Sequence, residues 1–323
     1  MKVLVCGGCG YIGSHMVRHL VALGHDVVVF DNLSTGHRAA IGDLPLVVGD
    51  LADPIVLNGL FADHRVDVVV HFCARSLVGE SVVDPYAYYQ NNVVGTLNLL
   101  QAMREAGVTR VVFSSTAAVF GNPVTELIDE THPTQPINPY GTSKLMVEHI
   151  LADAARAYGL RSVALRYFNA AGADPSGEIG ESHEPETHLI PNVLRAAHSG
   201  GAMRVFGDDY ATRDGTCMRD YVHVNDLATA HFKAIEFMEC HDGAHQFNLG
   251  NGQGFTVQEI IEAARRVTGK SIVVEHAARR AGDPPVLVAS SAKACEQLMW
   301  TPIFMDIDKI IESAWRWHQR PRY

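Results

Sequence analysis

The chain has 323 residues, of which 47% are hydrophobic and 19% are charged. This balance is typical of a globular protein rather than a disordered one, and the length allows one large or two modest domains. The 26 Lys and Arg residues against 36 Asp and Glu residues give a formal net charge of −10, which argues against a protein that binds the phosphate backbone of nucleic acids.

The cysteines and the apolar runs indicate the compartment. The six cysteines are scattered along the chain and match neither a secreted disulfide framework nor a zinc-binding set. No apolar run approaches the roughly 20 residues that span a bilayer, and the stretch before the first glycines is too short for a signal sequence. We therefore expect a cytoplasmic protein that does not associate with membranes.

The first half of the chain alternates short apolar runs with longer amphipathic segments. The short runs are rich in β-branched residues, which predicts strands covered on both faces, over residues 3–5, 27–30, 46–48, 68–70, 111–113 and 163–165. The longer segments predict helices over residues 11–23, 54–63, 86–106 and 140–158. This alternation indicates an α/β protein with a parallel, doubly wound sheet.

The alternation stops after residue 165. Residues 169–186 are rich in Gly, Pro, Asp and Glu and predict a loop. We expect short strands and four more helices beyond it, over residues 189–198, 226–238, 257–268 and 306–317. A domain boundary near residue 170 would separate residues 1–170 from a smaller mixed α/β domain, 171–323, some of whose segments return to the first. The smaller domain should cap the carboxyl ends of the sheet, where open α/β folds bind ligands.

A glycine-rich loop follows the first predicted strand and opens the first predicted helix. Its sequence is Gly7-Gly8-Cys9-Gly10-Tyr11-Ile12-Gly13, which fits both G-x-G-x-x-G and G-x-x-G-x-x-G. Missing side chains let the backbone turn tightly and approach a pyrophosphate on the amides of the helix N-terminus. The loop predicts a Rossmann-like fold with a dinucleotide-binding domain over residues 1–170.

Asp31 ends the second predicted strand and favours NAD over NADP. A carboxylate there can accept both ribose hydroxyls and would repel a 2′-phosphate, although His37 and Arg38 are close enough in sequence to weaken that preference. Asp50 and Leu51, after the third strand, could meet the adenine.

No metal site is expected. Cys6 and Cys9 form a lone C-x-x-C with no second pair, which indicates packing rather than redox or metal chemistry. His15 and His19 share a helix face but lack the glutamate of H-E-x-x-H. We expect no metal at His183 and His188 either.

Tyr140 and Lys144 are the strongest chemical signal. They lie four residues apart at a predicted helix start, so their side chains share a face. A tyrosine with a pKa of about 10 is a poor base, but a neighbouring ammonium group and the positive nicotinamide of NAD⁺ would lower that pKa. Thr116 ends the fifth predicted strand, where its hydroxyl can hold a substrate oxygen and relay its proton to the tyrosine.

The chain resembles the extended short-chain dehydrogenase/reductase superfamily and, within it, the UDP-glucose 4-epimerases. The resemblance runs from Val3 nearly to the C-terminus and is far more specific than a Rossmann signature alone. The stretches that carry it are residues 10–15, 31–33, 71–72, 78–81, 89–93, 139–148, 165–169, 219–224 and 280–283.

The resemblance implies an NAD-dependent isomerase of galactose metabolism that inverts C4 of a UDP-hexose through a 4-keto intermediate. Tyr140 would be the acid/base, Lys144 would tune it and bind the nicotinamide ribose, and Thr116 would assist at the 4-hydroxyl. The positions that correspond to residues around NAD are Gly7, Gly10, Tyr11, Ile12, Gly13, Asp31, Asn32, Asp50, Leu51, Phe72, Asn91, Tyr140 and Lys144. Those that correspond to substrate-binding positions are Thr116, Asn169, Leu189, Phe206, Arg219, Arg280, Asp283 and Leu287.

The physical chemistry of these side chains agrees with a UDP-sugar. Planar guanidinium groups match the oxygens of a diphosphate, and Phe206 can stack on a uracil. Ser76 stands where many relatives carry lysine, so one phosphate or ribose contact could be absent. We assign no chemistry to residues 208–216.

The sugar itself stays open. In the family, a tyrosine at the position of Leu287 excludes a 2-acetamido group, and leucine is smaller, so 4-epimerases of UDP-N-acetylhexosamines, UDP-pentoses or UDP-uronic acids are alternatives. A nucleotide-sugar 4,6-dehydratase is disfavoured, because Ala117 and Ala118 follow Thr116 where that chemistry needs Asp-Glu. A non-catalytic NAD-binding module would be expected to lose Tyr140, Lys144 or Thr116.

The expected partners are a UDP-sugar and a second copy of the chain. In the family, the helices over residues 92–106 and 140–158 pair across a two-fold axis as a four-helix bundle, which implies a homodimer. The apolar residues at helical spacing on these helices are Val93, Leu97, Leu100, Leu145 and Ile150.

Overall fold

A seven-stranded parallel sheet forms the larger part of the protein. The structure, a computed structural model, describes residues 1–280 and 284–323. The strand order is β11-β6-β5-β4-β1-β2-β3, and all six neighbouring pairs are parallel. The strands are β1 (Lys2–Cys6), β2 (Asp26–Asp31), β3 (Leu46–Val48), β4 (Val68–His71), β5 (Arg110–Thr116), β6 (Arg161–Tyr167) and β11 (Ala244–Leu249). The predicted doubly wound, Rossmann-like α/β fold is confirmed.

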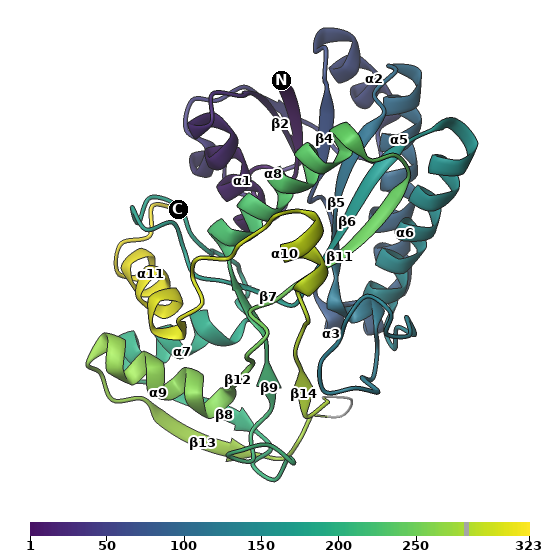
Figure 1. Cartoon of the computed structure of the whole chain (residues 1–323). Coiled ribbons are helices and arrows are strands. Elements are labelled where there is room, and N and C mark those ends of the chain that lie inside the picture. Colours follow the sequence, from purple (N-terminus) through teal and green to yellow (C-terminus); the bar gives the residue numbers. More distant parts are fainter. Residues whose placement is uncertain (281–283) are drawn as a thin grey trace.

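Helices cover both faces of this sheet (Figure 1). Val3 and Val5 of β1 join one core cluster with residues of α1 (Tyr11–Ala22) and α8 (Val224–Cys240). Leu4 and Cys6, which point the other way, join a second cluster with α2 (Pro54–Asp63), α5 (Gly95–Glu105) and α6 (Pro139–Tyr158). Alternate residues of one strand are therefore buried on opposite faces, which is why the strands read as continuous apolar runs.

The helix α6 has sequence signals at both ends that fix its length. The side chain of Asn138 accepts a hydrogen bond from the amide of Gly141 at 2.9 Å, and Pro139 occupies the first helical position. Gly159 ends the helix in the left-handed conformation, with φ of 76°. Because Asn and Pro start helices and glycine ends them at little cost, these residues hold Tyr140 at the first turn.

The predicted helix over residues 86–106 is interrupted. The chain forms α3 (Val78–Val83), α4 (Pro85–Tyr88), a π-helical turn (Tyr89–Val94) and then α5. Asn92 lies in this turn with its amide nitrogen 2.9 Å from the Ser143 hydroxyl of α6. Turns of this kind often mark functional sites, and this one ties α6 to the segment that precedes α5.

Most of the remaining elements form small sheets and helices to one side of the large sheet (Figure 1). The expected loop 169–186 contains a strand, β7 (Asn169–Ala171), that pairs with β10 (Tyr221–His223). None of the helices in the described part of the chain is long and apolar enough to cross a membrane. The other elements are η1 (Arg38–Ile41), η3 (Ala117–Val119), α7 (Leu189–Ser199), β8 (Ala202–Phe206), β9 (Met218–Arg219), β12 (Phe255–Thr256), α9 (Val257–Thr268), β13 (Val273–Ala277), β14 (Val286–Leu287), α10 (Ala292–Gln297) and α11 (Ile307–Gln319).

Three elements of the second half belong to the layers of the first. β11 pairs with β6 at the edge of the large sheet, and α8 packs beside α1 within the same core cluster. The helix α10 packs on β11 and contributes Ala294 to that cluster. The seven-stranded sheet therefore contains strands from both sides of the predicted boundary near residue 170.

Candidate active site

A cavity of about 730 Å³ opens at the carboxyl ends of the central strands. Gly7 follows β1, Phe72 follows β4, Thr116 ends β5 and Phe168 follows β6, and all four line it. The opposite wall comes from the second half of the chain. This is the edge at which open α/β sheets bind their ligands.

Two glycines of the loop have different roles. Gly13 allows close backbone packing within the loop, and Gly10 leaves space for a ligand. A Cβ atom on Gly13 would lie 2.0 Å from the carbonyl oxygen of Gly7, so Gly13 allows the loop to close on the helix. A Cβ on Gly10 would meet that same oxygen at an unremarkable 3.4 Å. The space beside Gly10 opens to the cavity, and a side chain there would fill it.

The N-terminus of α1 faces this space. Gly10 is its N-cap, no side chain among the described residues caps it, and the next three residues, Tyr11, Ile12 and Gly13, line the cavity. The Tyr11 hydroxyl donates to the carbonyl of Gly172 at 2.6 Å, which joins this end of the helix to the second half. Free amides at a helix N-terminus bind anions, so the loop fits the pyrophosphate of a dinucleotide.

Asp31 stabilises the glycine loop through hydrogen bonds to backbone amides. Its carboxylate accepts hydrogen bonds from the amides of Cys9 at 2.9 Å and Leu33 at 2.8 Å. Phe72 lines the cavity with the glycines. Five other predicted cofactor positions do not line the cavity: Asp31, Asn32, Asp50, Leu51 and Asn91.

Tyr140, Lys144 and Thr116 meet inside the cavity. The Nζ atom of Lys144 donates to the carbonyl of Ser114 at 2.7 Å, and the lysine is buried. Burial lowers the pKa of Lys144 to about 7, although the nearby Cys73 and Glu148 act to raise it. The lysine can therefore hold or release a proton near neutral pH.

The pKa of Tyr140 is raised above its ordinary value, not lowered. Burial of the phenol raises it, and a hydrogen bond with Thr116 lowers it in part. The sequence-based expectation assigned a lowering of this pKa to the Lys144 ammonium and the positive nicotinamide of NAD⁺ together. One proton of that ammonium is donated to the Ser114 carbonyl. Desolvation disfavours a phenolate, and it dominates here.

A buried polar network behind these residues was not predicted. Glu148 forms an ion pair with Arg166 at 2.5 Å and accepts the Ser115 hydroxyl at 2.5 Å. The hydroxyls of Ser114 and Tyr167 form a further, short hydrogen bond. The network ties β5, β6 and α6 together at the catalytic end. Its residues stand next to the motif residues in sequence, which is a signal that could have found them.

The predicted substrate positions divide into two groups. Thr116, Asn169, Arg219, Arg280 and Leu287 line the cavity. Leu189 and Phe206 do not, and Asp283 lies outside the described residues.

Arg280 lies close to one of these predicted positions. Its guanidinium group stacks 3.9 Å from the ring centre of Phe206. The Phe206 ring, which was expected to stack on a uracil, therefore contacts Arg280. Ser76 also lines the cavity, whereas residues 208–216 do not.

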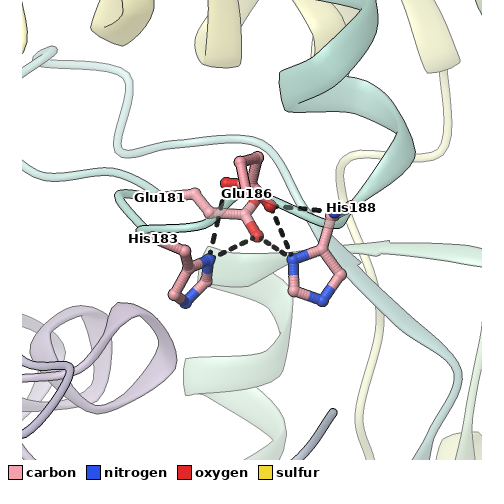
Figure 2. Close-up of side chains that lie close together, drawn as sticks. All are labelled: Glu181, His183, Glu186 and His188. Atoms are coloured by element: carbon pink, nitrogen blue, oxygen red, sulfur yellow. Dashed lines mark hydrogen bonds and ion pairs between the residues drawn. The ribbon is translucent and has the colours of Figure 1, made fainter. Parts of the chain in front are cut away.

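Four side chains beside the cavity form a cluster that was not expected from the sequence (Figure 2). Glu181, His183 and His188 line the cavity, and Glu186 completes the group. The Nδ1 atom of His188 lies 2.7 Å from Glu181 and 3.1 Å from Glu186. Burial would lower the pKa of His188, but these two carboxylates raise it to about 10.

Comparison with known proteins gives consistent matches over nearly the whole chain. Residues 3–250 match the NAD dependent epimerase/dehydratase family. A UDP-glucose 4-epimerase of Halalkalibacterium halodurans is 52% identical over 320 residues, which cover 99% of this chain and 96% of that protein.

Solved structures agree with the sequence matches. The crystal structure of UDP-glucose 4-epimerase from Brucella ovis in complex with NAD has a TM-score of 0.95 and 50% identity, covering 97% of each chain. That of Bifidobacterium longum in complex with NAD⁺ and UDP has a TM-score of 0.94 and 37% identity, covering 99% of each chain.

Proposed function

The chain belongs to the NAD dependent epimerase/dehydratase family, in its UDP-glucose 4-epimerase branch, and we propose that it interconverts UDP-glucose and UDP-galactose by inverting C4 of the hexose. NAD is the cofactor. The observation that carries the proposal is the meeting of Tyr140, Lys144 and Thr116 in one cavity with the glycine loop.

The chain supplies a cradle for the dinucleotide. The amides of Tyr11, Ile12 and Gly13 receive the pyrophosphate at the start of α1, and Asp31 holds the loop in shape through the Cys9 amide. When bound, NAD⁺ supplies a hydride acceptor for C4 of the sugar and, in its reduced form, a hydride donor to the resulting ketone. Because each turnover would return the oxidised form, the cofactor would not need to leave between turnovers.

Tyr140 acts as the acid/base for the 4-hydroxyl proton of the sugar. In its phenolate form, Tyr140 would take the proton of the 4-hydroxyl when the ketone forms. The resulting phenol would return that proton after the 4-keto sugar has turned its other face. Thr116, which is hydrogen-bonded to the phenol, orients it. The positive charge of protonated Lys144, whose pKa is lowered to about 7, would favour this phenolate together with the positive nicotinamide of bound NAD⁺. Burial of both groups strengthens these electrostatic effects.

The residues after Thr116 support epimerisation over dehydration. Ala117 and Ala118 line the cavity, and neither can serve as an acid or base at C5 and C6 of the sugar. A 4,6-dehydratase needs carboxyl groups there. Elimination of water from the ketone is therefore not assisted at these two positions.

We also propose a cytoplasmic homodimer that acts in galactose metabolism. Leu97 of α5 and Met146 of α6 are 44% and 42% exposed, and both lie on the helices expected to pair. Leu100 is buried in the core against the sheet, so the pairing face consists of the outward residues only. Apolar side chains gathered on neighbouring helices indicate an interaction surface.

One assay tests the activity and the cofactor together. The purified protein is incubated with UDP-glucose or UDP-galactose without added NAD, and the products are separated. The same mixture of the two sugars should form from either side, and denatured protein should release dinucleotide. The proposal would be contradicted if the protein did not interconvert the two sugars and if adding NAD did not produce activity.

A further inference from the structure

Glu181, His183, Glu186 and His188 gather on the segment between β7 and α7, in the wall of the cavity. One ligand atom from each of them lies within 4.8 Å of the others, and over residues 1–280 and 284–323 no other group of His, Cys, Asp and Glu side chains gathers in this way. Figure 2 shows the four side chains pointing toward one another. We propose that they bind one divalent transition metal ion, for which Zn²⁺ is the best match.

The distances between the ligand atoms fit a small tetrahedral site. The Nδ1 atom of His183 lies 3.3 Å from Glu181 and 3.5 Å from Glu186, and that of His188 lies 2.7 Å and 3.1 Å from the same two carboxylates. Zinc bonds of about 2.0–2.2 Å place neighbouring ligands about 3.3–3.6 Å apart in a tetrahedron. The shortest distance, 2.7 Å, is below this spacing and the 4.8 Å within which all four atoms lie is above it, so the side chains would have to adjust by up to about 1 Å when the ion binds.

The chemistry of the four ligands selects the class of ion. Two carboxylates balance the charge of a divalent cation, so the ion and its ligands are neutral together. Imidazole nitrogens favour zinc, iron, nickel or copper over calcium and magnesium, which prefer oxygen ligands alone. Four protein ligands leave no open coordination position, so the site is structural rather than catalytic.

His183 brings an independent observation. Its Nδ1 atom is buried and, among the described residues, has no partner in hydrogen-bond geometry, although two carboxylates lie within 3.5 Å. A buried polar atom without a directed partner is costly. A metal ion at the centre of the group would give this atom a bond along its lone pair.

The backbone around the ligands is already held in place. The amides of Thr187 and His188 both donate to Glu186 at 2.8 Å, and the indole of Trp317 donates to the carbonyl of Glu181 at 2.8 Å. The side chains of Glu181 and Glu186 are only 7% and 1% exposed. Ligands fixed by outer hydrogen bonds lose little entropy when the ion binds.

The location indicates what the ion would do. The ring of His183 packs edge-on against Tyr11 of the glycine loop, with 6.4 Å between ring centres. Glu181 is joined to α11 through Trp317, and His188 is the N-cap of α7. The ion would therefore fasten the cavity wall to both helices beside the dinucleotide loop. This inference departs from the sequence-based expectation of no metal at His183 and His188.

Metal analysis of the whole protein tests the inference without an activity assay. The wild type, a His183→Gln/His188→Gln variant and a His241→Gln/His245→Gln control are saturated with Zn²⁺, freed of loose ions by desalting and measured by mass spectrometry. The control removes a histidine pair with 6.4 Å between ring centres, His241 at the end of α8 and His245 in β11. We expect about one Zn²⁺ per chain in the wild type and the control and far less in the first variant.

Removing the ion from the wild type supplies the second measurement. A strong chelator should lower the melting temperature of the Zn²⁺-loaded wild type and control, and added Zn²⁺ should restore it. This arm needs no variant, so misfolding of the His183/His188 variant cannot obscure the outcome. Equal zinc content in the wild type and that variant, or a melting temperature indifferent to chelator, would leave only a hydrogen-bonded ion-pair cluster and overturn the inference. Zinc content and melting temperature do not depend on epimerase activity, so failure of the proposed function would leave both measurements valid.

Discussion

Arg166 and Glu148 form an ion pair inside the protein, with 2.5 Å between the guanidinium nitrogen and the carboxylate oxygen. Arg166 comes from β6 and Glu148 from α6, one helical turn after Lys144. Glu148 also accepts the hydroxyl of Ser115, the residue before Thr116. One carboxylate therefore links the strand that carries Thr116 to the helix that carries Tyr140 and Lys144.

Removing one partner of this pair should destabilise the protein more than removing both. Arg166→Met leaves Glu148 buried without its counter-charge, which typically costs about 3–5 kcal/mol. The double variant Arg166→Met/Glu148→Leu has no unpaired buried charge, so it should be more stable than Arg166→Met. Urea denaturation of the wild type, the single variant and the double variant measures both effects. A double variant that is less stable than Arg166→Met would contradict this account.

Tyr140→Phe should stop the chemistry and leave cofactor binding intact. Loss of a general acid/base lowers kcat by at least about 10²-fold. Thr116→Val, which removes the hydrogen bond to the phenol, should cost less. Rates of UDP-galactose conversion and the dinucleotide content of each denatured variant are the measurements. Near wild-type turnover by Tyr140→Phe would remove Tyr140 from its role.

Local sequence signals account for much of this arrangement. The six predicted strands all lie within observed strands, and the i, i+4 spacing of Tyr140 and Lys144 is enough to put both on one helix face. The pKa of Tyr140 also depends on the burial of the phenol, which raises it, and on where the Lys144 proton points. Neither can be read from spacing.

Long-range and irregular features were out of reach. Period and composition gave no sign that β11 would pair with β6, since the two strands lie far apart in sequence. The histidines and glutamates between residues 181 and 188 are close in sequence, but their side chains converge only through a non-repeating loop. A helix or strand pattern carries no information about such a turn.

Leu287→Tyr should narrow the range of sugars. Leu287 lines the cavity and packs against the small core cluster of Val119, Phe120 and Ile128, so a tyrosine would project further into the space. Leucine should allow slow turnover of UDP-N-acetylhexosamines beside the preferred hexoses, and a size difference of this kind gives about 1–3 kcal/mol of discrimination. The ratio of kcat/KM for UDP-N-acetylglucosamine and UDP-glucose should fall in the variant. An unchanged ratio would show that Leu287 does not border the sugar.

Stability should fall as the pH drops below neutral. Burial lowers the pKa of four histidines to between about 3 and 4: His15, His71, His223 and His231. Their unfolded pKa is about 6.5, so between these values the unfolded chain binds more protons. The free energy of unfolding therefore decreases from pH 6.5 toward pH 4, by up to about 1.4 kcal/mol per pH unit for each histidine.

His223→Asn isolates one of these contributions. The His223 ring accepts the amide of Asn225 as the N-cap of α8, and asparagine can cap in its place. Urea denaturation between pH 7 and pH 5 should give a shallower slope for this variant, and His241→Gln at the exposed end of the helix should keep the wild-type slope. A pH-independent free energy of unfolding in the wild type would be the contrary result.

Charges on the outward faces of α5 and α6 should dissociate the dimer. Leu97→Glu/Met146→Glu places two carboxylates in the apolar surface proposed to pair, and light scattering should report a monomer mass where the wild type gives twice that. Ile55 of α2 is 83% exposed but lies on another helix, so Ile55→Glu should leave the mass unchanged. A wild type that is monomeric at micromolar concentration would contradict the proposal.

The position of β11 means that the order of synthesis and the order of folding differ. A ribosome that has released residues 1–170 has released six strands of the sheet, but not the one that covers β6. Until residue 249 emerges, β6 presents an unpaired edge to its surroundings, and such edges recruit other chains. The helix α8, which covers one face beside α1, arrives only just before. A nascent chain that stalls between these points would offer both an open edge and an uncovered apolar face, which are the two features that make a partly synthesised chain prone to aggregate.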